Sequence, residues 1–108
     1  MKQLQYRQGD VLLVKVGGRP RGTWREVART EGRVILALGE ATGHAHAVLE
    51  PHAVLKQAAG VVDRYLEVLN KPATLVHEEH DSIKIEPGLY RVVRQREYDE
   101  VQERQVLD

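Results

Sequence analysis

Turn-favouring residues divide this chain into short apolar runs, and this division constrains the fold more than any other feature. The runs are four to seven residues long, rich in Val, Leu and Ile, and separated by Gly, Pro, Asn or charged residues. They occur at residues 11–16, 33–38, 44–50, 53–57, 64–69, 73–77, 82–85 and 89–94. No segment shows the apolar period of an amphipathic helix. The pattern predicts a mainly β chain of about seven to eight short strands, arranged as a single small β-barrel or sandwich.

The length and the distribution of these runs predict one domain with two less regular parts. A chain of 108 residues suits one domain and is too short for two. We expect a β domain over residues 1–96, interrupted by a long basic loop or irregular hairpin arm at residues 17–32. Trp24 and Val27 in that loop are expected to fold back onto the body. Residues 97–108 are charged and are expected to form a tail.

A tight turn near the end of the chain gives the most specific local prediction. Residues 82–85 alternate polar with apolar side chains, which is typical of a half-buried strand. Glu86-Pro87-Gly88 places Pro and Gly where a β-turn favours them, and an apolar run follows. We therefore expect residues 83–93 to form a β-hairpin.

Composition narrows the class of protein. The chain has no Phe and one Trp, so its core must be mainly aliphatic. The absence of Cys excludes disulfides and thiolate metal ligands, and a small disulfide-free domain fits the cytoplasm. The first residues are polar and lack the apolar segment of a signal peptide. No apolar stretch approaches the roughly 18 residues of a membrane span. We therefore expect a cytoplasmic protein that does not enter a membrane.

Charge is balanced overall but unevenly placed. Residues 1–36 carry eight Lys or Arg against three Asp or Glu, and the other residues carry eight against thirteen. Arg19, Arg21 and Arg25 flank Trp24, and nucleic-acid-binding proteins often combine cations with a stacking ring. One hypothesis is therefore a non-catalytic binding module that contacts nucleic acid or protein through the basic first third. The alternative, that the basic third pairs with the acidic remainder within the fold, stays open.

The histidines are the compositional feature that bears most directly on function. All five lie in one stretch of the chain, as His44, His46, His52, His77 and His80. Residues two apart in a strand share a face about 6.6 Å apart, so His44 and His46 could bind one cation. Glu50 lies four residues after His46 and shares that face if the strand continues. Without Cys, imidazole and carboxylate groups are the ligands available to a divalent Zn, Mn, Fe or Ni ion.

A second histidine pair occurs in the sequence His77-Glu78-Glu79-His80. Its spacing and the absence of a helical pattern separate it from the HExxH zinc-protease motif. In a strand the two histidines face opposite ways, whereas in a turn or bulge they could converge. The two pairs together predict a metal site drawn from His44, His46, Glu50, His77 and His80, with a small-molecule ligand in any open coordination position.

Two other interpretations of the histidines stay open. They could be neutral, hydrogen-bonded side chains with structural roles. They could also act without a metal, with His44 and His77 as the acid and base of a hydrolase. A serine nucleophile is nearly excluded, because Ser82 is the only serine, and no phosphate-binding glycine loop is present. The sequence does not decide whether the protein is an enzyme.

The segment from His44 to Glu50 resembles the first motif of the cupin barrels, in which HxH is followed three or four residues later by Glu. Pro72 to His77 is similar in part to the second cupin motif, with Thr74 at the position of its glycine. The resemblance implies a β-barrel whose metal is held by His44, His46, Glu50 and His77. The whole chain also resembles a family of small, uncharacterised bacterial and phage proteins with TGHAH, HEEH and GxYRVVRQREY segments, which implies no activity.

A polar stretch follows the last apolar run. Arg91 and Arg94 in it could bind a carboxylate or phosphate of a substrate through paired guanidinium hydrogen bonds. The alternative is a solvated edge strand, whose charges discourage pairing with another sheet. A sheet with such an edge is compatible with a homo-oligomer, although no residue specifies one.

Overall fold

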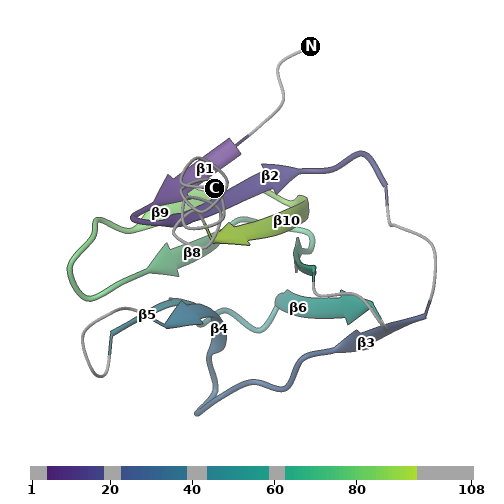
Figure 1. The fold of residues 1–108 in the computed structure, drawn as a ribbon, viewed down its shortest axis with the longest axis horizontal. Helices are drawn as coiled ribbons and strands as arrows, with labels where there is room; N and C mark the ends of the chain where they lie inside the picture. Colours follow the sequence, from purple (N-terminus) through teal and green to yellow (C-terminus); the bar gives the residue numbers. More distant parts are fainter. Residues whose placement is uncertain (1–4, 19–22, 39–43, 59–62, 95–108) are drawn as a thin grey trace, which may run out of the picture.

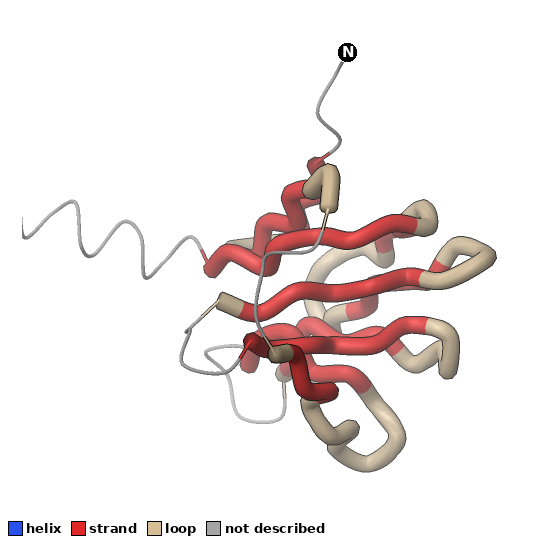
Figure 2. The backbone as a smooth tube through the Cα atoms, turned by 90° about the vertical axis from the view of Figure 1, so that its right-hand side faces the viewer, coloured by secondary structure: helices blue, strands red, loops and turns tan. Residues whose placement is uncertain are grey.

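The computed structural model describes residues 5–18, 23–38, 44–58 and 63–94. Every regular element in these residues is a β-strand, as Figure 2 shows. The ten strands are β1 (Gln5–Gln8), β2 (Val11–Lys15), β3 (Trp24–Glu26), β4 (Val34–Leu38), β5 (Ala45–Val48), β6 (Ala53–Ala58), β7 (Arg64–Val68), β8 (Ala73–Val76), β9 (Ile83–Ile85) and β10 (Gly88–Arg94). Among the described residues, no helix has the length and apolar character needed to cross a membrane.

The strands form two antiparallel sheets in a sandwich-like arrangement (Figure 1). One sheet has six strands in the order β1-β2-β10-β7-β6-β3, and the other has four in the order β4-β5-β8-β9. The prediction of a mainly β fold is confirmed, and of its two alternatives the structure has the sandwich rather than a closed barrel. The strands exceed the expected seven or eight because the polar segments that form β1 and β3 lack an apolar run.

The two sheets bury one largely aliphatic core between them. Leu13 and Leu66 reach it from the six-stranded sheet, and Leu36 and Leu75 reach it from the four-stranded sheet, each with 0% exposure. Burial of each such side chain stabilises the fold by about 1.5–3 kcal/mol. Tyr90 is the largest fully buried side chain, and its hydroxyl donates to the Glu86 carbonyl at 2.6 Å. The prediction of a mainly aliphatic core is therefore confirmed, with Tyr90 and the nearly buried Tyr65 as aromatic additions among the described residues.

The predicted hairpin over residues 83–93 is wrong. β9 pairs with β8 in the four-stranded sheet, whereas β10 lies between β2 and β7 in the six-stranded sheet. The turn at residues 86–88 therefore carries the chain from one sheet to the other. Gly88 has a φ of 153°, a conformation that side-chain-bearing residues rarely adopt. The hydrogen bond from the Tyr90 hydroxyl to the Glu86 carbonyl stabilises the turn. The turn at residues 86–88 was predicted correctly. The pairing of the strands on either side of it was not, because the packing of the core decides which strands pair.

The basic loop predicted at residues 17–32 is partly regular. β3 forms within it and pairs with β6 at the edge of the six-stranded sheet. The expected return of Trp24 and Val27 to the body is confirmed. The Trp24 ring packs edge-on against Tyr65 with centroids 5.0 Å apart, and Val27 packs against the core.

The prediction that Arg91 and Arg94 lie on an edge strand is also wrong. Both belong to β10, which has β2 on one side and β7 on the other. A central position was hard to see from the sequence because β10 ends in charged residues.

Candidate functional site

The pairing of β5 with β8 brings the two histidine pairs together. Ala47 pairs with Val76 and Val48 pairs with Leu75 in this antiparallel ladder. Continuing the same register by one residue places His46 opposite His77. The backbone N–H of Ala45 then donates to Glu78 Oε1 at 2.9 Å, just past the end of β8. Residues more than thirty positions apart thereby become neighbours.

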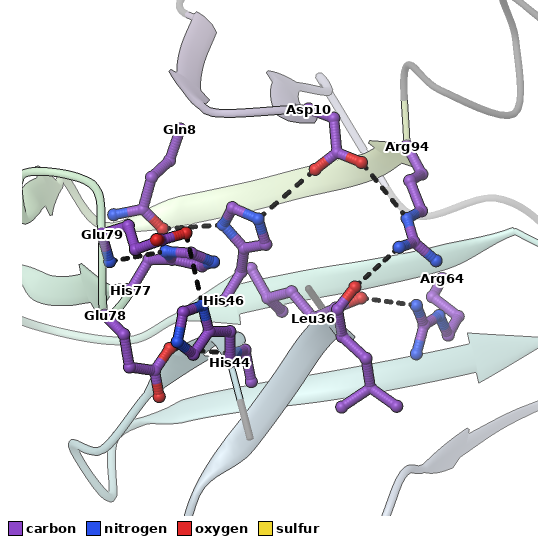
Figure 3. A network of polar contacts seen from close by, with 12 residues as sticks. Gln8, Asp10, Leu36, His44, His46, Arg64, His77, Glu78, Glu79 and Arg94 are labelled. Atoms are coloured by element: carbon purple, nitrogen blue, oxygen red, sulfur yellow. Dashed lines mark hydrogen bonds and ion pairs between the residues drawn. The ribbon is translucent and has the colours of Figure 1, made fainter. Parts of the chain in front are cut away.

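Four of the five histidines form one group, which we call the histidine cluster: His44, His46, His77 and His80. The ring centroids are 4.4 Å apart for His46 and His77, and 4.6 Å apart for His77 and His80. His44 lies 5.7 Å from His77 by the same measure. His77 therefore contacts the other three rings, and Figure 3 shows it close to His44 and His46. The chain leaves the strand at His77 and bends at residues 78–80, which is why His77 and His80 converge.

His46 is the buried member of the cluster, with an exposure of 2%. Its Nδ1 lies 2.9 Å from Gln8 Oε1. The Gln8 amide has a fixed orientation, because its Nε2 donates to the carbonyls of Leu75 and Asp81 at 3.0 and 2.9 Å. Gln8 Oε1 can only accept, so His46 Nδ1 carries a proton. In the neutral ring, Nε2 therefore holds the free lone pair.

That lone pair faces a carboxylate. His46 Nε2 lies 3.4 Å from Asp10 Oδ1. The pKa of His46 is lowered, chiefly because burial penalises the charged ring and also because His77 lies nearby, while Asp10 acts in the opposite direction. The neutral form is therefore favoured at neutral pH. His46 Nε2 and Asp10 Oδ1 are then two acceptor atoms that face each other. A proton or cation between them stabilises this arrangement.

Glu78 adds a carboxylate to the outer part of the cluster. The hydrogen bond from the Ala45 backbone holds its pKa below the usual range, and His44 and His77 act in the same direction. Glu78 is exposed, whereas His44 and His77 are half-buried. One ligand atom from each of His44, His77 and Glu78 lies within 4.8 Å of the other two. We call these three residues the outer trio.

Glu79 contacts both histidines of the outer trio. Its Oε1 lies 3.3 Å from His44 Nδ1. Its backbone N–H donates to His77 Nδ1 at 3.0 Å, so this nitrogen is unprotonated in the structure. A neutral His77 ring therefore carries its proton on Nε2.

The predicted ligand Glu50 does not join the cluster. β5 ends at Val48, so the strand does not continue far enough to keep Glu50 on the face of His46. Glu50 Oε2 instead accepts from the Thr74 backbone N–H at 3.0 Å. His52, which was not predicted as a ligand, also lies apart from the cluster, and its Nε2 contacts the Pro72 carbonyl at 2.9 Å.

The two arginines predicted to bind an anion line a cavity between the sheets. Arg94 also contacts Asp10, with 3.4 Å between its Nε and Oδ2. Asp10 therefore lies between the histidine cluster and Arg94 (Figure 3).

The residues predicted to contact nucleic acid are only partly described. Arg19 and Arg21 lie outside the described residues. Arg25 is exposed on β3, while the Trp24 ring is engaged with Tyr65. A nucleic-acid or protein partner stays a prediction.

Sequence reasoning missed Glu78, Gln8 and Asp10. Glu78 lies in the HEEH segment, but the sequence interpretation treated that segment as a strand with alternating faces, whereas the chain bends there. Gln8 and Asp10 flank Gly9 in the turn between β1 and β2, far from the histidines in sequence. A Cβ at Gly9 would lie 2.7 Å from His80 Nε2 and 3.2 Å from His46 Cε1, so this turn touches the cluster directly. No local signal connects a Gly-Asp turn with a distant histidine pair.

Comparison with known proteins gives one match. The model of a family described as a domain of unknown function (DUF8820) matches residues 7–95. No curated protein and no solved structure matches the chain.

Proposed function

The chain belongs to the DUF8820 family, and we propose that it is a metal-binding protein. The outer trio of His44, His77 and Glu78 holds one divalent transition-metal ion. The observation that carries the proposal is the convergence of one ligand atom from each residue within 4.8 Å.

The spacing of the outer trio suits a metal after a small adjustment. Ligand atoms about 2.1 Å from a tetrahedral ion lie about 3.4 Å from one another. The trio therefore needs to contract by at most about 1.4 Å. Glu78 is exposed and follows a strand end, so rotation of its side chain supplies most of this movement.

The donor atoms favour a borderline transition metal. Two imidazole nitrogens and one carboxylate oxygen suit Zn, Mn, Fe or Ni better than Ca or Mg. Three protein ligands leave at least one coordination position for water or a small-molecule ligand. A metalloenzyme would use that position to polarise a substrate or activate water, but the geometry favours no particular reaction.

The hydrogen bonds around the trio fit ligand and support roles. Glu78 Oε1 is held by the Ala45 amide, which leaves Oε2 for a metal. His77 Nδ1 accepts from the Glu79 amide, so coordination through either nitrogen requires that bond to change. Metal binding should therefore perturb the Glu79 amide more than any backbone group outside the cluster.

The proposed ligand set differs from the one that the cupin resemblance implies. Glu78 takes the place of Glu50, because the Glu50 carboxylate is bonded to Thr74. His46 is a supporting residue and not a ligand in this set, because its Nδ1 is hydrogen-bonded to Gln8. His80 packs on His77 and is the nearest candidate for a fourth ligand.

The test is metal binding by tag-free protein that has been stripped with chelator. We expect about one equivalent of Zn, Mn, Fe or Ni by elemental analysis, and a rise in thermal unfolding temperature on metal addition. Glu78→Gln should weaken binding at least about tenfold, and the double variant His44→Ala/His77→Ala should abolish it. In an NMR titration, the Glu79 and Ala45 amide signals should move.

Two matched controls accompany these variants. Glu86→Gln removes an exposed carboxylate outside the cluster, and His52→Gln removes the histidine outside it; both should bind metal as the wild type does. Less than a tenth of an equivalent in the wild type with all four metals would contradict the proposal. So would an affinity that Glu78→Gln leaves unchanged.

A further inference from the structure

A second chemical environment lies on the other side of Asp10 from the histidines. It is a half-open cavity of about 850 Å³ between the two sheets. β4 forms one wall, and β7 and β10 form the other. Cavities that bind small molecules usually measure about 300–1,000 Å³, so the volume suits a ligand of moderate size.

The polar lining of this cavity is mostly cationic. Arg33, Arg64, Arg91 and Arg94 line it, and Asp63 is the acidic residue among its described lining residues. The guanidinium groups of Arg33, Arg64 and Arg94 beside low-dielectric walls create a positive potential that favours an anion. The basic residues come from β7, β10 and the loop before β4, so only the folded chain gathers them.

Two of these arginines are held in place by backbone carbonyls. Arg64 donates to the Leu36 carbonyl and Arg94 donates to the Leu38 carbonyl, each at 2.6 Å. Figure 3 shows both guanidinium groups beside the β4 backbone. A guanidinium has five N–H donors, so each group keeps further donors for a ligand. Their orientation is fixed before a ligand arrives, which lowers the entropic cost of binding.

The other two arginines are less constrained. The guanidinium groups of Arg33 and Arg91 form no hydrogen bond or ion pair with another described residue. Arg91 is exposed and Arg33 is half-buried at the cavity wall. Arg33 can turn toward an oxyanion and bind it in the paired geometry that guanidinium favours. Arg91 lies between the core-facing Tyr90 and Val92 on β10, so its side chain points to the opposite face of the strand.

Apart from Thr30, the remaining lining is aliphatic. Val27, Ile35 and Val92 contribute apolar surface beside the arginines, and all three are half-buried. A fully inorganic ion would leave this surface exposed to water. A ligand with an apolar body gains from covering it.

We propose that this cavity binds a small organic anion, with its carboxylate or phosphate group on the arginines and an aliphatic body against Val27, Ile35 and Val92. The proposal goes beyond metal binding and does not require it. Asp10 connects the two sites, because Oδ1 faces His46 and Oδ2 faces Arg94. A bound anion would thus lie beside the histidine cluster.

The test compares ligands that share one body and differ in charge. Chelator-treated protein is titrated by calorimetry and by NMR with octanoate, octyl phosphate, octanol and octylammonium, and with acetate and inorganic phosphate. We expect octanoate or octyl phosphate to bind at least about tenfold more tightly than the neutral and cationic compounds. Acetate and inorganic phosphate should bind more weakly than their octyl counterparts. The stronger of the two octyl anions identifies the headgroup.

Variants locate the binding site. Arg33→Gln and Arg64→Gln should each weaken the octyl anion about tenfold, because each removes a charged hydrogen-bond donor at the cavity. Arg25→Gln, on exposed β3 outside the cavity lining, is the matched control and should bind as the wild type does. Ile35→Thr should weaken the octyl anions without changing the weak binding of acetate.

Three outcomes would overturn the proposal: no binding of either octyl anion, equal binding of octanol and octanoate, or equal weakening by Arg25→Gln and Arg33→Gln. Because the protein is metal-free in every titration, these outcomes leave the metal proposal untouched. Failure of metal binding likewise leaves the anion proposal standing.

Discussion

Two regions of the molecule combine histidine with glutamate, and they use these residues differently. Near the turn between β5 and β6, Glu50 accepts from the Thr74 amide and His52 contacts the Pro72 carbonyl. Each side chain therefore has a backbone partner at the start of β8. In the histidine cluster, the side chains mainly face one another, and His44, His77 and Glu78 direct ligand atoms toward a shared point.

The difference teaches that residue type alone does not separate a structural pair from a ligand pair. Glu50 and His52 each bond to a backbone group near the start of β8, although the buried His52 Nδ1 has no hydrogen-bond partner among the described residues. The outer trio places two imidazole rings and a carboxylate close together, and this is the donor set that the proposed metal would use. The partner of each side chain, rather than its identity or spacing, distinguishes the two regions.

The largest effect within this comparison should come from His46, the buried base of the cluster. His46→Ala should lower the free energy of unfolding by about 3 kcal/mol, because it leaves a cavity and an unpaired Gln8 oxygen. Urea unfolding at pH 7 measures this loss. His52→Ala, the matched histidine in the other region, should cost about 1 kcal/mol. Equal losses would mean that His46 is not the structural centre of the cluster.

Metal addition should separate the two regions most clearly. A metal at one hundred times its dissociation constant should raise the free energy of unfolding of the wild type by about 2.7 kcal/mol. The double variant His44→Ala/His77→Ala should show no rise, whereas Glu50→Gln/His52→Gln should show the full rise from a lower starting value. Urea unfolding with and without metal tests both. If only Glu50→Gln/His52→Gln lost the metal-dependent rise in unfolding free energy, the metal would bind in the Glu50 region instead of the outer trio.

Acid should weaken the Glu50 region through one carboxylate. Burial is the largest single influence and raises the Glu50 pKa, but hydrogen bonds from Thr74 and from the Glu50 amide, together with His52, outweigh it in sum, so the net pKa lies below its ordinary value of 4.5. A carboxylate whose pKa is lowered on folding stabilises the protein above pH 4.5 and loses that contribution as pH falls below it.

Glu50→Gln should therefore cost about 1 kcal/mol or less at pH 7, and this cost should shrink toward zero near pH 3. Urea unfolding of both proteins at pH 7, 4.5 and 3 measures the difference. A cost that stays constant with pH would show that the charge of Glu50 has no role.

The smallest effect is expected for the outer histidines in the absence of metal. His44→Ala should change the free energy of unfolding by no more than about 0.5 kcal/mol, because His44 is half-buried and its Glu79 partner is exposed. Chelator-treated protein is required for this measurement. A loss approaching that of His46→Ala would show that the outer trio, like the Glu50 region, is structural.

The strands were predictable where side chains alternate or form apolar runs, because such runs require burial on a sheet face. β2, β4, β6, β7 and β8 therefore lie close to their predicted positions. β1 was not predictable, because its sequence Gln-Tyr-Arg-Gln is polar and it forms by pairing with β2. The hairpin over residues 83–93 failed for a related reason, since a turn specifies a change of direction but not which strands pair afterwards.

The candidate site was predictable in its histidines and not in its carboxylate. His44 and His46 lie two apart, and His77 and His80 flank two acids, so both pairs were visible as metal-ligand patterns. The choice between Glu50 and Glu78 depended on where β5 and β8 end. Strand ends are set by the partner strands and the core, so single-sequence patterns do not fix them.

By itself, the sequence determined a mainly β chain with an aliphatic core, two histidine pairs and a basic first third. Only the tertiary structure decided that β5 lies beside β8 in a register that brings His46 opposite His77, with Gln8 and Asp10 from a distant turn behind them. It also gathered four arginines around one cavity. The physical reason is that burial patterns are local, because each strand must cover its own apolar face. Strand pairing and register are non-local, because they are chosen by the packing of the whole core.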